Sequence, residues 1–364
     1  MKLADALQTL AAADRPDPAL LVRLLALSEP REQEALFAAA YEMKRQQVGK
    51  VVHFRGLIEL SNVCAKNCLY CGIRRDHDIR RYTMTRDEIL ACARLAFKSR
   101  YGSIVLQAGE RSDAAFVDFI EEIVRAVKAL SEGKLGITLS LGEQTEETYA
   151  RWFTAGAHRY LLRIETSSPE LYRQLHPADH SFEARVACLR MLRRVGYQVG
   201  TGGMIGLPFQ TLEDLARDVL FFKDMDIDMI GMGPYVLHEA TPIAAHVVNT
   251  EDEKQRRFDL ALRMIAVTRL ALRDVNIASA TALQALDPAG RERALLAGAN
   301  IIMPNLTPKA YRGDYLLYED KPCVDEEGDQ CTACLARRIA SIGETIGWDA
   351  WGDSKHALAR SRQG

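Results

Sequence analysis

From Val52 onward, short apolar runs alternate with amphipathic helical patterns, and this alternation constrains the fold more than any other feature. Each run is short enough for a strand, and the segments between them repeat apolar residues at three- and four-residue spacing. The expected strands are residues 52–60, 103–107, 135–139, 158–164, 197–204, 226–231, 275–280 and 299–303. Eight alternations predict a parallel sheet, and eight is the number that closes a TIM-type (β/α)8 barrel. An open, doubly wound sheet is the alternative α/β fold.

The segments that flank the barrel differ from it. Residues 1–50 are rich in Ala and Leu with helical spacing, which predicts N-terminal helices. The barrel is expected over residues 51–304, and residues 305–364 form a C-terminal extension with further cysteines. Inside the barrel, Thr85 followed three residues later by Glu88 predicts a capping box at the start of one helix.

Charge and hydropathy exclude several classes of partner. The 47 Lys and Arg against 49 Asp and Glu give a net charge of -2, so no basic excess attracts nucleic acid or anionic lipid. The first ten residues lack the apolar segment of a signal peptide, and no apolar run approaches the roughly 18 residues of a membrane span. We therefore expect a cytoplasmic protein.

The strongest chemical signal is Cys64, Cys68 and Cys71, a C-x3-C-x2-C loop directly after the first expected strand. Three thiolates this close can each hold one iron of a cubane [4Fe–4S] cluster. Since no fourth cysteine lies nearby, the fourth iron would be open to an outside ligand. The alternatives are a structural zinc site completed by His53 or His77, and a redox dithiol of Cys68 and Cys71 alone.

This loop resembles that of the radical S-adenosylmethionine (radical SAM) superfamily, in which SAM chelates the open iron and is cleaved to a 5′-deoxyadenosyl radical. The resemblance implies that Gly109-Glu110 receives the SAM amino group, Glu165 the ribose, Arg185 the carboxylate and Met204 the adenine end. The SAM contacts that it implies are Tyr70, Gln107, Gly109, Glu110, Ser140, Glu165, Arg185 and Met204. Taken singly, these residues are ordinary loop residues or surface ion pairs.

The glycine-rich stretch from Gly202 to Pro208 raises a second nucleotide-binding possibility. A dinucleotide-binding loop would need G-x-G-x-x-G, and Ile205 stands where its last glycine is required. We therefore interpret this stretch as a close backbone approach to SAM.

Five longer segments indicate which family within the radical SAM superfamily the chain resembles. They are 55–64, 66–76, 138–143, 159–163 and 302–305. Together they resemble the HydE family of [FeFe]-hydrogenase maturases, relatives of biotin synthase and methylornithine synthase. The resemblance implies assembly of the H-cluster diiron subsite on a cysteine-derived, iron-bound substrate, with HydG, HydF and an electron donor as partners. Alternatives are a methylornithine synthase-like mutase, a sulfur-inserting synthase, and a non-catalytic iron–sulfur scaffold, which would not need the SAM contacts.

Three arginines indicate the charge of the substrate. Arg55, Arg159 and Arg163 lie on expected strands and could meet inside the barrel, where a buried Arg is costly unless an anion pairs with it. We expect a cavity for a carboxylate- or cyanide-bearing substrate, with internal Arg–Glu pairs as the alternative. The resemblance adds Thr138, Thr281, Met303 and Tyr318 to the cavity wall. The chain departs from the family pattern at Ala108, Ile164 and Ala280, where that pattern often has Ser, His and Thr.

A second group of cysteines, Cys323, Cys331 and Cys334, lies in the C-terminal extension beside acidic turn residues. It resembles the second cluster site that some HydE-family members carry. Three thiolates could hold a [2Fe–2S] or a [4Fe–4S] cluster, and zinc is the alternative. The remaining thiols, Cys92 and Cys188, lie on amphipathic helices and are expected in the core.

Overall fold

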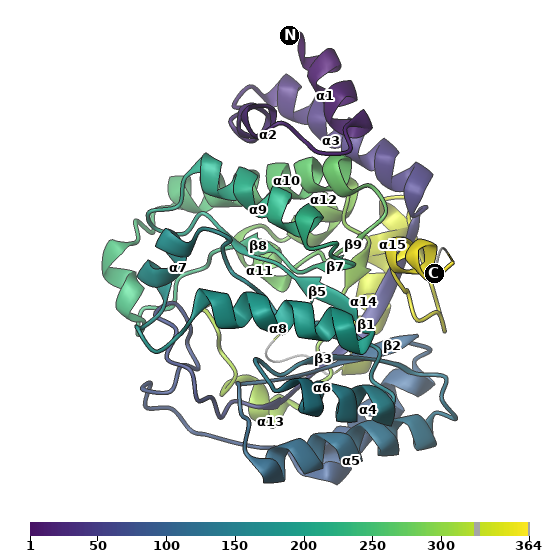
Figure 1. The fold of residues 1–364 in the computed structure, drawn as a ribbon. Coiled ribbons are helices and arrows are strands. Elements are labelled where there is room, and N and C mark those ends of the chain that lie inside the picture. The colour runs from purple at the N-terminus through teal and green to yellow at the C-terminus, as the bar shows by residue number, and fades with distance from the viewer. Residues whose placement is uncertain (324–327, 363–364) are drawn as a thin grey trace.

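A ring of parallel strands forms the centre of the molecule, with helices around it (Figure 1). The computed structural model describes residues 1–323 and 328–362, and within helix 328–341 it does not describe the side chains of residues 328–331. Within the described residues, the strands neighbour one another in the order β10-β1-β2-β3-β4-β5-β7-β9. They are β1 (Val51–Ser61), β2 (Ser103–Ala108), β3 (Gly136–Ser140), β4 (Arg159–Leu161), β5 (Gln198–Thr201), β7 (Met229–Ile230), β9 (Asn276–Ile277) and β10 (Ile301–Ile302).

The two ends of this strand order meet and close the ring. Ala278, just after β9, forms a parallel bridge with Ile301 of β10. The Ser279 N–H donates to the Ile301 carbonyl at 2.8 Å, and the Asn300 N–H donates to the Ile277 carbonyl at 2.9 Å. The predicted TIM-type (β/α)8 barrel is therefore confirmed, and an open doubly wound sheet is excluded.

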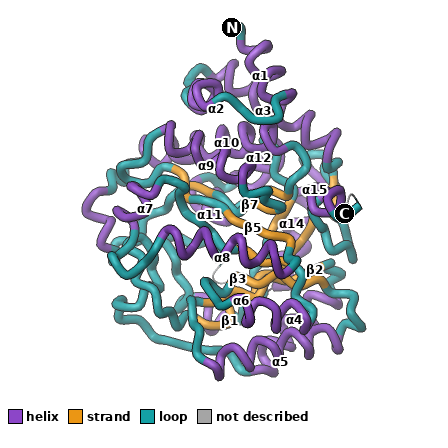
Figure 2. The backbone as a smooth tube through the Cα atoms, in the orientation of Figure 1, coloured by secondary structure: helices purple, strands orange, loops and turns teal. Residues whose placement is uncertain are grey.

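Helices enclose the strands on the outside, as Figure 2 shows in purple around orange. The longer barrel helices are α4 (Arg86–Lys98), α5 (Ala114–Leu130), α6 (Glu146–Ala155), α8 (Phe182–Val195), α9 (Leu212–Asp224) and α10 (Glu251–Leu272). The shorter ones are α7 (Pro169–Leu175), η1 (Pro242–His246, a 3-10 helix), α11 (Thr281–Leu286) and α12 (Gly290–Leu296), and α13 (Lys309–Arg312) follows in the C-terminal extension. At the start of α4, the Thr85 hydroxyl accepts from the Glu88 N–H and the Glu88 carboxylate accepts from the Thr85 N–H, so the predicted capping box is confirmed.

Three N-terminal helices cover one side of the barrel (Figure 1). They are α1 (Leu3–Ala12), α2 (Pro18–Leu25) and α3 (Pro30–Gln47). All three contact α10, which therefore lies between them and the barrel. This position explains why α10 buries residues on more than one face, including the run from Met264 to Leu272.

At the carboxyl ends of the strands the chain leaves the ring earlier than the sequence predicts. The expected strand 158–164 is regular only over β4, because the Ile164 N–H donates to the Thr201 side-chain oxygen at 3.1 Å in place of a main-chain carbonyl, and Glu165 then adopts a left-handed φ of 65°. A small parallel pair, β6 (Met204–Ile205) with β8 (Gly233–Pro234), forms there instead. This pair positions Met204 at the mouth of the barrel.

The C-terminal extension reaches both ends of the barrel. Its elements after α13 are α14 (Gly328–Ser341), β11 (Thr345–Ile346) and α15 (Lys355–Arg360). β11 pairs with the first residues of β1, and α15 lies at the opposite end from the long mouth loops (Figure 2). No helix among the described residues is both long and apolar enough to span a membrane.

Candidate active site

A cavity of about 260 Å³ opens at the carboxyl ends of the strands, and we call it the mouth cavity. Active sites of this fold lie at that end, because the loops that follow the strands converge there. All three cysteines of the first triad and all eight predicted SAM contacts line it: Cys64, Cys68, Cys71, Tyr70, Gln107, Gly109, Glu110, Ser140, Glu165, Arg185 and Met204. The structure thus brings together residues from six separate segments of the chain, which include strand ends, loops and helix α8.

The three thiols of the first triad are half-buried. Burial raises the pKa of Cys64 and Cys71, and it raises the pKa of Cys68 to about 12. A thiolate in this environment therefore needs a cationic partner such as iron. Some stabilisation is already present, since the Glu110 N–H donates to Cys64 Sγ at 3.3 Å.

The three thiols line the same cavity. Among the described residues, no three His, Cys, Asp or Glu side chains form a group able to hold a single metal ion. Zinc needs four donors around one ion, whereas a cubane takes each thiolate on a different iron. The donor set therefore fits a [4Fe–4S] cluster better than the zinc alternative.

A side chain outside the predicted set holds the cysteine loop in shape. Arg81 donates to a ring of main-chain carbonyls around the loop, those of Asn62, Ile73, Arg74, Arg75 and His77. Asn62 adds bonds to the carbonyls of Arg80 and Asp314, both at 2.7 Å. Five carbonyl acceptors on one guanidinium fix the loop backbone without using a carboxylate.

At Gly109 the turn after β2 approaches the cysteine loop so closely that only glycine fits. A Cβ built on Gly109 would stand 2.4 Å from the Val63 carbonyl oxygen and 2.8 Å from Cys64 Cβ. The turn after β2 therefore packs directly against the cysteine loop, and Gly109 positions that loop as well as facing the cavity.

Four charged side chains form a network on one wall of the mouth cavity. Lys66 Nζ lies 2.9 Å from Glu143 and 3.4 Å from Glu110. Arg185 Nε lies 2.7 Å from Glu143, and its Nη2 lies 3.6 Å from Glu110. Although burial opposes the charge on Glu143, Arg185 and Lys66 lower its pKa, whereas burial raises the pKa of Glu110. Glu143 is thus the carboxylate that holds the two cations in place.

Other predicted contacts have well-defined partners. Glu165 accepts a hydrogen bond from Arg163 at 2.7 Å, which brings a predicted substrate residue beside a predicted SAM residue. The Tyr70 hydroxyl lies 3.3 Å from His176 Nε2, and Gln107 donates to the Tyr315 hydroxyl at 3.3 Å. These contacts orient the side chains and leave the cavity open between them.

Comparison with known proteins identifies this arrangement. The family model of the radical SAM superfamily matches residues 58–222. The [FeFe] hydrogenase maturase subunit HydE of Thermotoga maritima is 46% identical over 93% of this chain and 94% of its own length. The chain belongs to the HydE family of radical SAM proteins. Membership implies a [4Fe–4S] cluster and SAM as cofactors, and it implies that the protein is an enzyme.

More distant relatives share the fold of this HydE-family chain. The 3-methylornithine synthase of Methanosarcina acetivorans is 26% identical over 88% of this chain and 87% of its own length. The crystal structure of methylornithine synthase (PylB) superposes with a TM-score of 0.80 at 25% identity, covering 94% of this chain and 98% of that one. Both relationships agree with the predicted family neighbourhood.

The structure separates the predicted substrate residues of the HydE-family chain into groups. Arg163 and Tyr318 line the mouth cavity. Arg55, Thr138 and Met303 instead line a cavity of about 20 Å³ deeper in the barrel. Thr281 accepts a hydrogen bond from Arg291 at 3.1 Å and is not among the residues that line either cavity.

The prediction that three arginines meet around an anionic substrate needs correction. Arg159 is fully buried at the amino end of β4 and is bonded to Asp353 of the C-terminal extension. Arg55 donates to the Gly352 carbonyl at 3.0 Å and to the Met229 sulfur at 2.9 Å. The anion that offsets Arg159 is thus part of the chain itself, because the extension folds back and closes that end of the barrel.

Neither Cys323 nor Cys334 of the second cysteine triad is among the residues that line the mouth cavity. Cys323 is half-buried with a left-handed φ of 63°, and its carbonyl accepts from Arg312 at 2.6 Å. Cys334 is exposed on α14. Cys331 belongs to α14, but its side chain lies outside the described part of the chain. The lone thiols Cys92 and Cys188 are buried in the core, as predicted.

Sequence reasoning missed Lys66, Arg81 and Glu143. A signal was available for Glu143, which follows β3 as Glu110 follows β2, so that position in the barrel already marked it. Lys66 lies inside the cysteine loop and could have been selected in the same way. Arg81 gave no signal, because its role depends on carbonyls that only the folded loop gathers.

Proposed function

We propose that this chain acts in [FeFe]-hydrogenase maturation as a radical SAM enzyme that helps to assemble the diiron subsite of the H-cluster. One observation supports the proposal: three cluster-spaced thiols and eight residues suited to SAM line one cavity, in a chain 46% identical to a HydE over nearly its full length. A scaffold protein would need only the cysteines.

Cys64, Cys68 and Cys71 would hold three irons of the cluster, leaving the fourth for SAM. When bound, the reduced cluster supplies one electron to the SAM sulfonium, which yields methionine and a 5′-deoxyadenosyl radical. The chain orients SAM for this step. Arg185 receives the methionine carboxylate, and Glu143 holds Arg185 in position through its 2.7 Å ion pair.

The ribose and amino ends of SAM are held by residues at the ends of two other strands. Glu165 accepts the ribose hydroxyls, and its bond from Arg163 fixes the carboxylate orientation. The turn at Gly109 and Glu110 receives the amino group close to the cysteine loop. Because these contacts come from different strands, SAM binding depends on the closed barrel.

The substrate is a cysteine-derived, iron-bound small molecule. Arg163 and Tyr318 line the mouth cavity, where a guanidinium suits a carboxylate or cyanide ligand. HydG and HydF are the partner maturases, and a separate protein delivers the electron. These assignments rest on the family relationship and on the charge of this wall.

Cys323, Cys331 and Cys334 would hold a second iron–sulfur cluster. The C-x7-C-x2-C spacing places Cys331 and Cys334 one turn apart on α14. Three thiolates suit a [2Fe–2S] cluster with one further ligand or a [4Fe–4S] cluster with one open iron, and zinc is the competing metal.

The test is anaerobic reconstitution with iron and sulfide, followed by reductant and SAM. We expect 5′-deoxyadenosine from the wild type and none from Cys68→Ser. Cys92→Ser, a buried thiol outside the cavity, is the matched control and should keep the wild-type rate. If Cys68→Ser forms the product at the wild-type rate, the radical SAM mechanism is refuted.

A second assay separates the maturase from the mutase. Cell-free activation of apo-hydrogenase with HydG and HydF present should depend on this chain. The competing function is that of a 3-methylornithine synthase, and the observation that supports it is the similarity to methylornithine synthase, with a TM-score of 0.80. Formation of 3-methylornithine without any stimulation of hydrogenase activation would replace the proposed function with that one.

A further inference from the structure

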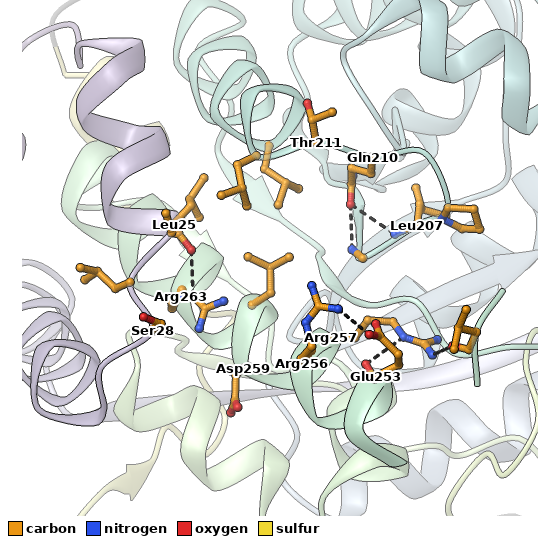
Figure 3. Close-up of a pocket in the computed structure, with 18 of the residues that line it drawn as sticks. Leu25, Ser28, Leu207, Gln210, Thr211, Glu253, Arg256, Arg257, Asp259 and Arg263 are labelled. Carbon is orange, nitrogen blue, oxygen red and sulfur yellow. Dashed lines mark hydrogen bonds and ion pairs between the residues drawn. The ribbon is translucent and has the colours of Figure 1, made fainter. Parts of the chain in front are cut away.

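A cavity of about 770 Å³ lies outside the barrel between α2, α9 and α10. Its walls come from the end of α2, the loop after β6, the segment after η1 and one face of α10. Figure 3 shows Arg256, Arg257 and Arg263 on α10 opposite the segments that carry Leu25 and Gln210. We call it the outer cavity. Its volume suits a small-molecule ligand.

Two of its arginines lack a carboxylate partner. Arg263 donates from Nε to the Leu25 carbonyl at 2.9 Å and makes no other hydrogen bond or ion pair with a described residue. Arg257 donates only to the carbonyls of Glu253, Tyr235 and Val248. Both therefore keep a full positive charge next to the cavity.

The two carboxylates of the outer cavity, Glu253 and Asp259, form their ion pairs with arginines other than Arg257 and Arg263. Glu253 forms an ion pair with Arg256 one turn along α10. Asp259 accepts from Gln255 at 3.0 Å and lies 3.7 Å from Arg293, which does not line the cavity. Asp259 and Glu253 still act electrostatically on Arg263 and Arg257, but three arginines against two carboxylates leave the lining with a net positive charge.

The remaining wall is largely apolar, with Leu27, Leu207, Leu212, Leu215 and Leu260 among its residues. Val248 at the edge is 64% exposed, so apolar surface continues to the opening. We propose that the outer cavity binds an organic anion, a carboxylate or phosphate ester on an apolar body, with Arg263 as the main anion contact.

The outer cavity shares a wall with the mouth cavity. Gln210 accepts from the Gly206 N–H at 2.7 Å and donates to the Met204 carbonyl at 2.9 Å. Met204 lines the mouth cavity, whereas Gly206 and Gln210 line the outer one. An occupant of the outer cavity would therefore contact the loop after β6 on the side away from the mouth cavity. It would not compete with SAM for the mouth cavity.

The test is calorimetric titration of the reconstituted protein with saturating SAM, so that the mouth cavity is filled. The probes are octanoate, octyl phosphate, octanol and inorganic phosphate. We expect one saturable site for octanoate, octyl phosphate or both, and their ratio identifies the preferred anion. Octanol and inorganic phosphate should each bind at least about tenfold more weakly, because each lacks one half of the recognition.

Variants locate the site. Arg263→Gln should weaken binding at least about tenfold, whereas Arg217→Gln, an exposed arginine of α9 outside the cavity, should change it less than about twofold. Equal binding to Arg263→Gln and wild type would overturn the proposal, and so would equal binding of octanol and octanoate. If Arg263→Gln does not fold, the comparison of probes on the wild type still decides. None of these outcomes depends on radical activity, so they are independent of the proposed function.

Discussion

At the residue scale, Glu143 is the carboxylate that holds the charged side chains of Lys66 and Arg185 in position in the mouth cavity. It joins Lys66 of the cysteine loop to Arg185 of α8, and its own side chain is only 15% exposed. Buried cations are unfavourable without an anion, and removing one partner of such a set leaves the others uncompensated. The position of Arg185 therefore depends on Glu143.

We predict that Glu143→Gln weakens SAM binding by about tenfold or more, because Arg185 loses the charge that orients it. Iron content should stay at the wild-type value, since Glu143 is not a cluster ligand. Equilibrium binding of SAM and iron per chain measure the two effects. The matched control is Glu146→Gln, an exposed carboxylate that pairs with Arg194. An unchanged SAM dissociation constant in Glu143→Gln would remove it from this positioning role.

At the scale of single elements, α15 is attached to the closed end of the barrel by charge. His356 lies between Asp226 at 2.6 Å and Asp274 at 3.2 Å. Arg360 forms ion pairs with Asp226 and Asp228. The hydrogen bonds that His356 donates to the two carboxylates raise its pKa from the ordinary 6.5 to about 9.

This raised pKa predicts a pH-dependent stability. A group whose pKa is higher in the folded state stabilises the fold fully below its unfolded pKa, and the contribution is lost as pH rises through the folded pKa. We expect the charged His356 to contribute roughly 1–2 kcal/mol after allowance for solvent screening, present at pH 6 and lost above about pH 9.

The measurement is urea unfolding of the wild type and of His356→Gln at pH 6 and pH 10. The free-energy difference between the two proteins should be largest at pH 6 and should vanish at pH 10. A difference that is the same at both pH values would mean that His356 acts by packing and not by charge.

At the scale of the whole molecule, the two cysteine triads belong to different parts of the structure. The first lines the mouth cavity, and neither Cys323 nor Cys334 does. The segment that carries the second triad follows β10 and leads into β11, which pairs with the amino end of β1. The second triad is therefore not needed for electron transfer from the first cluster to SAM.

We therefore predict that the variant Cys323→Ser/Cys331→Ser/Cys334→Ser loses the iron of the second site and its spectroscopic signal. It should still cleave SAM at a rate close to that of the wild type, because the mouth cavity is unchanged. Iron analysis, electron paramagnetic resonance and 5′-deoxyadenosine formation test this. Loss of SAM cleavage with the first cluster intact would make the second site part of the mechanism.

The barrel, the cysteine loop and the neighbouring residues that line the mouth cavity could be predicted from the sequence alone. Strand and helix periodicity is local, and the carboxyl ends of parallel strands always share one edge. Residues just after expected strands, such as Glu110 and Glu165, were therefore predictable as neighbours although 55 positions separate them.

How the barrel is closed and which charges form pairs could be learned only from the three-dimensional structure. Arg159 meets Asp353 across 194 positions of chain, because the C-terminal extension returns to the amino ends of the strands. The outer cavity likewise exists only where α2 packs beside α9 and α10. Such contacts depend on where distant segments dock, and side-chain packing over the whole molecule sets this, whereas local periodicity contains no information about it.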